Sequence, residues 1–266
     1  MSAQQFTEVA LQSGIDFVYD FGDFHFGGGA AALDFDNDGW EDVYITGGAN
    51  HDRLYRNNGD GTFSDATAIS GINHPHLLTQ GVAAADINND GYKDLFVSTR
   101  CHTNSLNQYA HNLLYLNNGD GTFTDISASS GIAAGHEHST SIAFGDFNLD
   151  GWIDIYVLNF LGVPMYNIFN PNTGLHITPQ RPGSANFLYL NNGDTTFTEV
   201  AANYGVEDWG SGWACVFSDF DGDADADIYV ANYFGQNPSA PNNTLYQYDH
   251  QACLLYTSDA ADELSC

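Results

Sequence analysis

The sequence predicts an all-β fold, a β-propeller built of four-stranded antiparallel blades. Three observations lead to this prediction. A nine-residue acidic stretch occurs four times, beginning at residues 34, 86, 146 and 219. Each copy lies between two runs of strand-forming residues and is followed by a Leu-Tyr segment. The repeat has no helical periodicity, so we expect four blades in a repeat array.

Each unit contains signals for four strands in order. Small residues precede the acidic stretch, as in "GVAAADI" (81–87), and suit the innermost strand, where blades crowd the axis. The second strand follows the acidic stretch, as in "DVYIT" (42–46). The third and fourth strands flank an "NNGDGTF" hairpin, whose Gly and Asn residues accept positive φ. We expect Asp60, Asp120 and Asp194 to cap these hairpin turns rather than to bind a ligand.

One copy of the fourth-strand pattern, "FTEVALQSGI" (6–15), precedes all the units. In a ring closed by both ends of the chain, this segment would complete the last blade beside residues 244–248, which would protect the sheet edges. Four units and one orphan strand instead indicate an arc of a larger ring of about seven blades. We therefore predict a propeller fragment over residues 1–252, with exposed edges that associate.

The composition limits the classes of partner. The chain has 34 Asp and Glu against 5 Lys and Arg, a formal charge of −29, which argues against nucleic acid or an anionic membrane and favours cations. No apolar run is long enough for membrane insertion, and the first ten residues have no signal-peptide pattern. The stretch "CLLYTSDAADE" resembles the translation of a sequencing-library adapter, so we exclude residues 253–266 from the fold.

The acidic stretches have the pattern of cation-binding loops. Side-chain oxygens recur at positions 1, 3, 5 and 9, and Gly stands at position 6 in three of the four stretches. A loop that turns back on itself would bring these oxygens onto one centre, with the backbone carbonyl of position 7 as a further ligand. The candidate ligands are Asp34, Asp36, Asp38, Trp40, Asp42, Asp86, Asn88, Asp90, Tyr92, Asp94, Asp146, Asn148, Asp150, Trp152, Asp154, Asp219, Asp221, Asp223, Asp225 and Asp227.

Ca²⁺ fits this ligand set best, with up to four ions, one for each loop. Mg²⁺ demands a tighter octahedron, and the loops contain no His or Cys that would favour zinc. Position 12 of an EF-hand would hold Glu, but Ile45, Val97, Val157 and Val230 stand there, so these are not EF-hands. The alternative is that the loops are Asx turns that bend the chain without a metal.

The loops resemble the calcium loops of FG-GAP or VCBS repeats, which form the propeller blades of integrin α-subunits. Together, "FTEVALQSGI", "GGGAAALDFDNDG" and "LYRNNGDGTF" are most similar to the propeller half of the cartilage acidic protein (ASPIC and UnbV) family, over residues 6–248. The resemblance implies an extracellular, cell-surface or periplasmic location. The sequence has no counterpart of that family's C-terminal domain.

Strand order places the acidic loops and the hairpins at one end of the blades, and the connections from second to third strand at the other. These connections span 12, 20, 34 and 18 positions, over 42–54, 94–114, 154–188 and 227–245. Variable loops on a rigid scaffold often carry binding. The candidate ligand face therefore includes His25, His76, His102, His136, His138, Tyr166, His176, Trp209 and Tyr233.

We expect the longest connection, 155–187, to fold as a lid beside His136, His138, Trp209 and Tyr233 and to form one wall of a binding groove. The alternative is that the histidines are ordinary polar loop residues and that the aromatic residues only cover the scaffold.

Three functions remain open from the sequence. The first is a non-enzymatic calcium-binding module that recognises a protein or glycan, where adhesion follows from the resemblance to integrin blades alone. The second is a polysaccharide lyase or hydrolase, in which His and Tyr abstract a proton while Arg100 and Arg181 bind an acidic sugar. The third is a scaffold for a C-terminal domain. We favour the first and assign no catalytic residue.

Overall fold

The computed structural model describes most of the chain. The described residues are 6–20, 27–72, 77–100, 111–132, 138–160, 168–170, 175–177, 185–232 and 243–249. For 168–170 and 175–177, the backbone alone is described.

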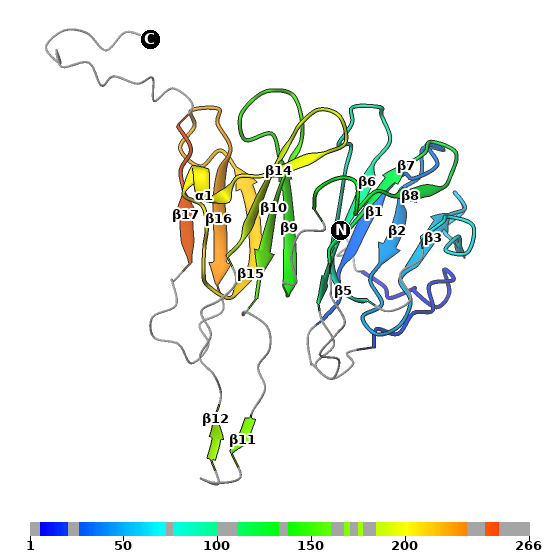
Figure 1. Ribbon diagram of the computed structural model, residues 1–266. Helices are drawn as coiled ribbons and strands as arrows, with labels where there is room; N and C mark the ends of the chain where they lie inside the picture. The colour runs from blue at the N-terminus through cyan, green and yellow to red at the C-terminus, as the bar shows by residue number, and fades with distance from the viewer. Residues whose placement is uncertain are drawn as a thin grey trace, which may run out of the picture.

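Four antiparallel sheets stand side by side as blades (Figure 1), which confirms the predicted all-β repeat architecture. Blade 1 consists of β1 (Ala30–Leu33), β2 (Asp42–Ile45), β3 (Arg53–Asn57) and β4 (Phe63–Asp65). Blade 2 consists of β5 (Leu78–Ala85), β6 (Asp94–Arg100), β7 (Leu113–Asn117) and β8 (Phe123–Asp125). Blade 3 consists of β9 (Ser139–Gly145), β10 (Asp154–Asn159), β13 (Phe187–Asn191) and β14 (Phe197–Glu199). Within the described residues, blade 4 consists of β15 (Gly212–Ser218), β16 (Asp227–Asn232) and β17 (Thr244–Tyr246).

The innermost strands β1, β5, β9 and β15 lie next to one another in this order. Their small residues are required by close approach. A Cβ atom added to Gly29 would lie 2.9 Å from the backbone nitrogen of Val82, and one added to Gly81 would lie 2.3 Å from the carbonyl oxygen of Thr140. Blades 1 and 4 lie at opposite ends of the row in Figure 1, and the described sheets do not close into a ring.

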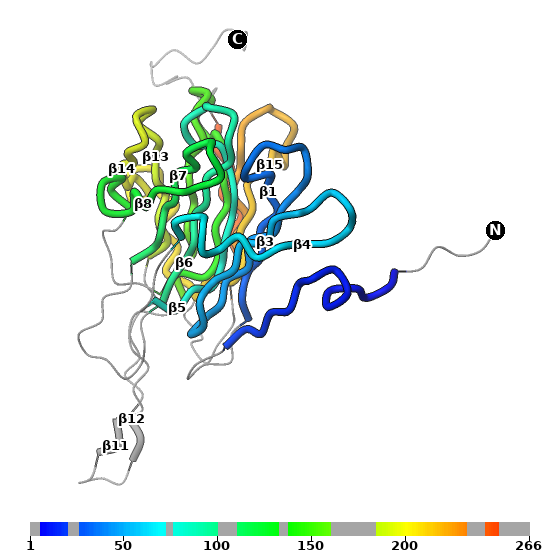
Figure 2. Tube along the Cα trace, turned by 90° about the vertical axis from the view of Figure 1, so that its right-hand side faces the viewer, coloured from blue at the N-terminus to red at the C-terminus, as the bar shows by residue number. Residues whose placement is uncertain are grey.

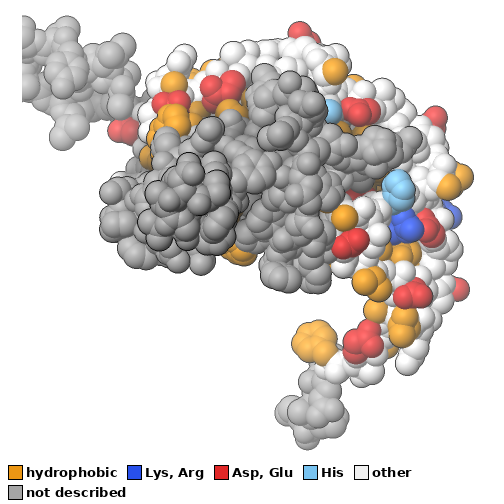
Figure 3. Space-filling model, turned by 60° about the horizontal axis from the view of Figure 1, so that its bottom comes forward, with side chains coloured by type: hydrophobic (Ala, Val, Ile, Leu, Met, Phe, Trp, Pro, Cys, Tyr) orange, Lys and Arg blue, Asp and Glu red, His pale blue; other side chains and the backbone are white. Residues whose placement is uncertain are grey.

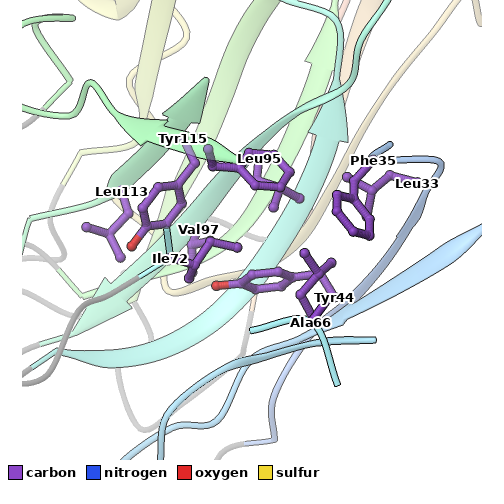
Figure 4. Close-up of a cluster of buried hydrophobic side chains, with 11 residues drawn as sticks. Leu33, Phe35, Tyr44, Ala66, Ile72, Leu95, Val97, Leu113 and Tyr115 are labelled. Atoms are coloured by element: carbon purple, nitrogen blue, oxygen red, sulfur yellow. The ribbon is translucent and has the colours of Figure 1, made fainter. Parts of the chain in front are cut away.

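The hydrophobic core lies between blades rather than within them. Between blades 1 and 2, Tyr44 lies in one cluster with Leu95, Val97 and Tyr115 (Figure 4). Leu54 belongs to the same cluster, and all five side chains are fully buried. Equivalent clusters join blade 2 to blade 3 and blade 3 to blade 4. Full burial of one such side chain contributes about 1.5–3 kcal/mol, so each blade depends on its neighbour for stability.

Blade 4 has the apolar side chains that join the other blades to the next one, but no described blade packs against them. Phe147 and Leu188 of blade 3 are 2% and 1% exposed because they pack against blade 4. The equivalent Phe220 and Leu245 of blade 4 are 49% and 46% exposed, and Val216 on the same blade is also exposed. We call these three side chains the outer face of blade 4. In blades 1, 2 and 3, the equivalent face packs against the next blade.

The segment 6–15 does not form the predicted fourth strand, and it does not pair with residues 244–248, although both segments are described. Its turn instead packs beside blade 1, where the N–H of Phe63 donates to the carbonyl of Ser13 at 2.6 Å (Figure 2). The same bond joins later units, from Phe123 to Ser70 and from Phe197 to Ser130. Residues 6–15 thus lie against blade 1 as the last segment of each later unit lies against the blade that follows it. The strand is missing because no described strand lies beside residues 6–9 to pair with it.

Two elements depart from the repeat. The longest connection contains a hairpin of β11 (Ile168–Asn170) and β12 (Leu175–Ile177), which pair only with each other and lie beyond the lower ends of the blades in Figure 1. The rest of 161–184 lies outside the described residues, so the predicted lid remains a prediction. A short helix, α1 (Ala201–Tyr204), follows β14, where no helix was expected. No helix among the described residues is long and apolar enough to cross a membrane.

Candidate metal centres

Each acidic stretch folds into a loop between the first and second strands of its blade. We call residues 34–42, 86–94, 146–154 and 219–227 loops 1 to 4. In loop 1, Oδ1 of Asp34 accepts a hydrogen bond from the N–H of Asp38 at 3.0 Å, and Oδ2 accepts one from Gly39 at 2.8 Å. The carboxylates at position 1 of the other loops accept equivalent bonds. These bonds define the bend, so a cation would bind a loop that is already formed.

Position 6 of every loop lies in the left-handed region of φ. Gly39 has φ 91° and a Cβ atom there would meet nothing within 4 Å, so the requirement for Gly is conformational alone. In loop 4 the position is held by Ala224, with φ 78°. A residue with a Cβ atom loses about 1–2 kcal/mol in this region. Loop 4 therefore adopts the same bend as the others, but at a conformational cost that the other three loops avoid by having Gly at position 6.

The carboxylate at position 9 joins the loop to the third strand. Asp94 is fully buried, its Oδ2 accepts from the N–H of Ile87 at 3.0 Å, and its Oδ1 accepts from Asn117 at 2.8 Å. The equivalent residues Asp42, Asp154 and Asp227 make the same pair of bonds. Burial raises the pKa of Asp94 to about 7, and the two N–H donors offset only part of this effect. Burial likewise raises the pKa of Asp154 to about 7 and that of Asp42 to about 6.

The aromatic residue at position 7 packs on the hairpin of its own blade. A Cβ atom added to Gly59 would lie 2.8 Å from Nε1 of Trp40, and one added to Gly119 or Gly193 would lie 2.8 Å from Tyr92 or 3.0 Å from Trp152. The hairpins are turns, as predicted. For example, Oδ1 of Asp60 accepts from both the N–H and the hydroxyl of Thr62, and Asp120 and Asp194 do the same in blades 2 and 3. The loop and the hairpin therefore form one packed unit.

Carboxylate oxygens converge where the sequence predicted ligands. Among the described residues, three groups have ligand atoms within 4.8 Å of one another: Asp34, Asp36 and Asp42; Asp219, Asp221 and Asp227; and Asp223, Asp225 and Asp249, of which Asp249 was not a predicted ligand. The first two groups are positions 1, 3 and 9 of loops 1 and 4. In loops 2 and 3, position 3 is Asn88 or Asn148, which supplies an amide oxygen instead. An all-oxygen set of this kind fits a hard cation such as Ca²⁺.

One oxygen in loop 1 has no hydrogen-bond partner. Oδ1 of Asp36 is buried and accepts no hydrogen bond from the described residues, whereas most buried polar atoms are paired. Because a cation at the three converging carboxylates would supply the missing partner, this atom supports the assignment of a metal-binding loop.

Sequence reasoning missed the role of Arg56. Its Nε lies 2.5 Å from Oδ2 of Asp36, and its Nη2 lies 2.6 Å from Oδ2 of Asp38. The signal in the sequence was the replacement, in "LYRNN", of the leucine that occupies this position in "LYLNN". The two contacts show that this position on β3 faces loop 1.

A repeated polar residue before the third strand was also missed. In blade 2, Oδ1 of Asn112 accepts from the N–H of Thr99 at 3.0 Å, and in blade 3, Oδ1 of Asn186 accepts from Asn159 at 2.8 Å. Asp52 and Asn243 do the same in blades 1 and 4. This residue joins the two ends of each connection from second to third strand. The signal was an Asp or Asn two residues before the Leu-Tyr pair in all four units.

The candidate ligand face is only partly described. Trp209 is half exposed, and His138 is partly buried. Burial, together with the positive charge of Arg100, lowers the pKa of His138 to about 4, so its imidazole is neutral at physiological pH. Figure 3 views this end of the molecule and shows acidic, basic and histidine side chains among the described atoms. The side chains of His25, His76, His102, His136, Tyr166, His176 and Tyr233 lie outside the described residues.

Known proteins share the repeat. A family model described as "FG-GAP-like repeat" matches residues 34–97, 104–157 and 177–230, more than half of the chain. Cartilage acidic protein 1 of Xenopus tropicalis is 28% identical over 179 residues, which cover 66% of this chain and 23% of that protein. Cartilage acidic protein 1 of Homo sapiens is 26% identical over 216 residues, which cover 66% of this chain and 31% of that protein. The matched region thus spans about a quarter to a third of these relatives.

Proposed function

The chain belongs to the family of FG-GAP-like repeats, and on this premise we propose that it is a calcium-binding recognition module that works outside the cell. The observation that carries the calcium assignment is the convergence of position 1, 3 and 9 carboxylates within 4.8 Å in loops 1 and 4. The extracellular location is supported by the likeness to cartilage acidic protein 1. The recognition role is supported by the family assignment and by connections that differ in length at one end of the blades.

The side chains at positions 1, 3, 5 and 9 would hold the cation in each loop. Bound Ca²⁺ would supply positive charge where carboxylates otherwise face one another, and it would stabilise the folded protein through its binding free energy. Because the position 9 carboxylate also bonds to the third strand, this stabilisation would extend from the loop to its blade. The partner that we propose is a protein or glycan at the opposite end.

The calcium assignment is tested by removing the metal. Protein that is first shown by elemental analysis to contain calcium should melt at a lower temperature in excess chelator. A single site held at one hundred times its dissociation constant contributes about 2.7 kcal/mol to stability. An unchanged melting curve would reject calcium binding.

A pair of matched variants separates metal binding from loop stability. Asp150→Asn keeps the oxygen that accepts from Trp152 but removes one ligand charge from loop 3. Asp120→Asn makes the same chemical change in a hairpin that is assigned no metal. We expect the first variant to lose one bound calcium by isothermal titration and the second to lose none. Equal stoichiometry in the two variants would contradict the assignment of loop 3.

A further inference from the structure

We propose that Arg56 is a resident counter-cation of loop 1, which competes with Ca²⁺ for Asp36 and Asp38 and makes loop 1 a weaker calcium site than it would otherwise be. This inference rests on the proposed calcium function and adds a regulatory residue to it. Arg56 lies on β3, one strand away from the loop, and its guanidinium contacts both carboxylates at once.

The contacts of Arg56 involve atoms that a cation would need. Oδ1 of Asp38 accepts from the N–H of Trp40 at 3.0 Å, and Arg56 holds the other oxygen, Oδ2, at 2.6 Å, so both oxygens of Asp38 already have a partner. In Asp36, Arg56 holds Oδ2 and leaves the buried Oδ1 without a partner. A divalent cation could therefore engage Asp36 first, but it would have to displace the guanidinium from Asp38.

The other loops show that this arrangement follows the residue at position 3. In loops 2 and 3 that residue is Asn, whose Nδ2 donates to the carboxylate at position 5 at 2.8 Å, and the strand position of Arg56 is held by Leu116 or Leu190. In loop 4 position 3 is Asp221, and the residue equivalent to Arg56 is Gln247, directly after β17, which donates to Asp221 at 3.2 Å. A donor at this place, in or directly after the third strand, thus occurs only in the two loops whose position 3 is a carboxylate.

The charges at positions 1, 3, 5 and 9 account for the arginine beside loop 1. Loop 1 has Asp at positions 1, 3, 5 and 9, whereas loops 2 and 3 have Asp at three of these positions and Asn at the fourth. With the positive charge of Arg56, these four positions of loop 1 carry the same net charge as the corresponding positions of loops 2 and 3. Position 8 adds a negative charge in loop 1, from Glu41, and a positive charge in loop 2, from Lys93. Like charges at this density repel, so Arg56 stabilises loop 1 when no metal is bound. The same positive charge repels an arriving Ca²⁺ at short range.

The competition can be measured at loop 1 alone. Terbium, a calcium substitute, emits when it is excited through a tryptophan in its own loop, and Trp40 and Trp152 stand at position 7 of loops 1 and 3. In a Trp152→Phe background, emission excited through tryptophan reports on loop 1, and its displacement by calcium gives the calcium affinity. The test variant is Arg56→Leu, which has the residue of blades 2 and 3. The control is Arg53→Leu, which removes the same charge from an arginine that pairs with Asp65.

We expect Arg56→Leu to raise the calcium affinity of loop 1 about tenfold or more, and Arg53→Leu to leave it unchanged. Arg56→Leu should also lower the melting temperature of the metal-free protein, and calcium should restore it. A purely structural role would lower the melting temperature with and without calcium and leave the affinity unchanged, which would overturn the inference alone. Absence of calcium binding by the parent protein at every loop would overturn the proposed function as well.

Discussion

Replacing Gly71 by Ala should weaken the contact between blades 1 and 2, because this glycine lies where the first unit meets the second. Its φ is 80°, and an added Cβ atom would lie 2.7 Å from the carbonyl oxygen of Phe123. The left-handed conformation costs an alanine about 1–2 kcal/mol. Relief of the clash would also break the hydrogen bond from Phe123 to Ser70, worth about 1 kcal/mol. We expect a total loss of about 2–3 kcal/mol in the free energy of unfolding, measured by urea denaturation.

The matched control is Gly61→Ala, in the hairpin of blade 1. Gly61 has φ 86°, but an added Cβ atom would meet nothing within 4 Å, so this variant should lose only the conformational part, about 1–2 kcal/mol. The difference between the two variants therefore isolates the contact between blades. Equal losses would refute the reasoning, because they would mean that the junction of Gly71 with Phe123 contributes nothing to stability.

Three further predictions follow from the geometry. Ala224→Gly should stabilise the protein by up to about 1 kcal/mol in urea, because it removes the left-handed alanine of loop 4, and a loss of stability would contradict this. Burial raises the pKa of Cys215 to about 12, so at pH 8 mass spectrometry should find this thiol unreactive toward iodoacetamide until urea unfolds the chain; rapid alkylation of the folded protein would contradict the burial. Finally, Phe220→Ser with Leu245→Ser should reduce concentration-dependent association in light scattering, whereas Leu149→Ser, at a similarly exposed position, should not.

The repeat could be predicted from the sequence because its signals are local. The spacing of Asp34, Asp36, Asp38 and Asp42 lies within one loop, and the strands on either side have short, distinctive patterns. The structure places these residues in one loop and brings positions 1, 3 and 9 together. The turn role of Asp60 was predictable for the same reason, since its partner Thr62 is two residues away.

The features that were missed depend on pairing between strands. Arg56 reaches Asp36 from 20 positions away, and the contact depends on the register of β3 against β2. Asp94 looked like one more ligand, but its bonds to Ile87 and Asn117 give it a structural role as well. The segment 6–15 has a strand pattern but forms no strand, because strand formation requires a partner that local sequence does not supply.

The polar residue that precedes each third strand has a consequence for evolution and for engineering. Because Asn186 bonds to Asn159, the two ends of the longest connection stay together whatever lies between them. The connections range from 12 positions between Asp42 and Leu54 to 34 between Asp154 and Leu188. Loop-closure entropy makes that difference cost only about 1 kcal/mol. Natural insertions can therefore accumulate at this end of the blades, and foreign peptides can be grafted there, while the register of the strands and the acidic loops at the far end stay intact.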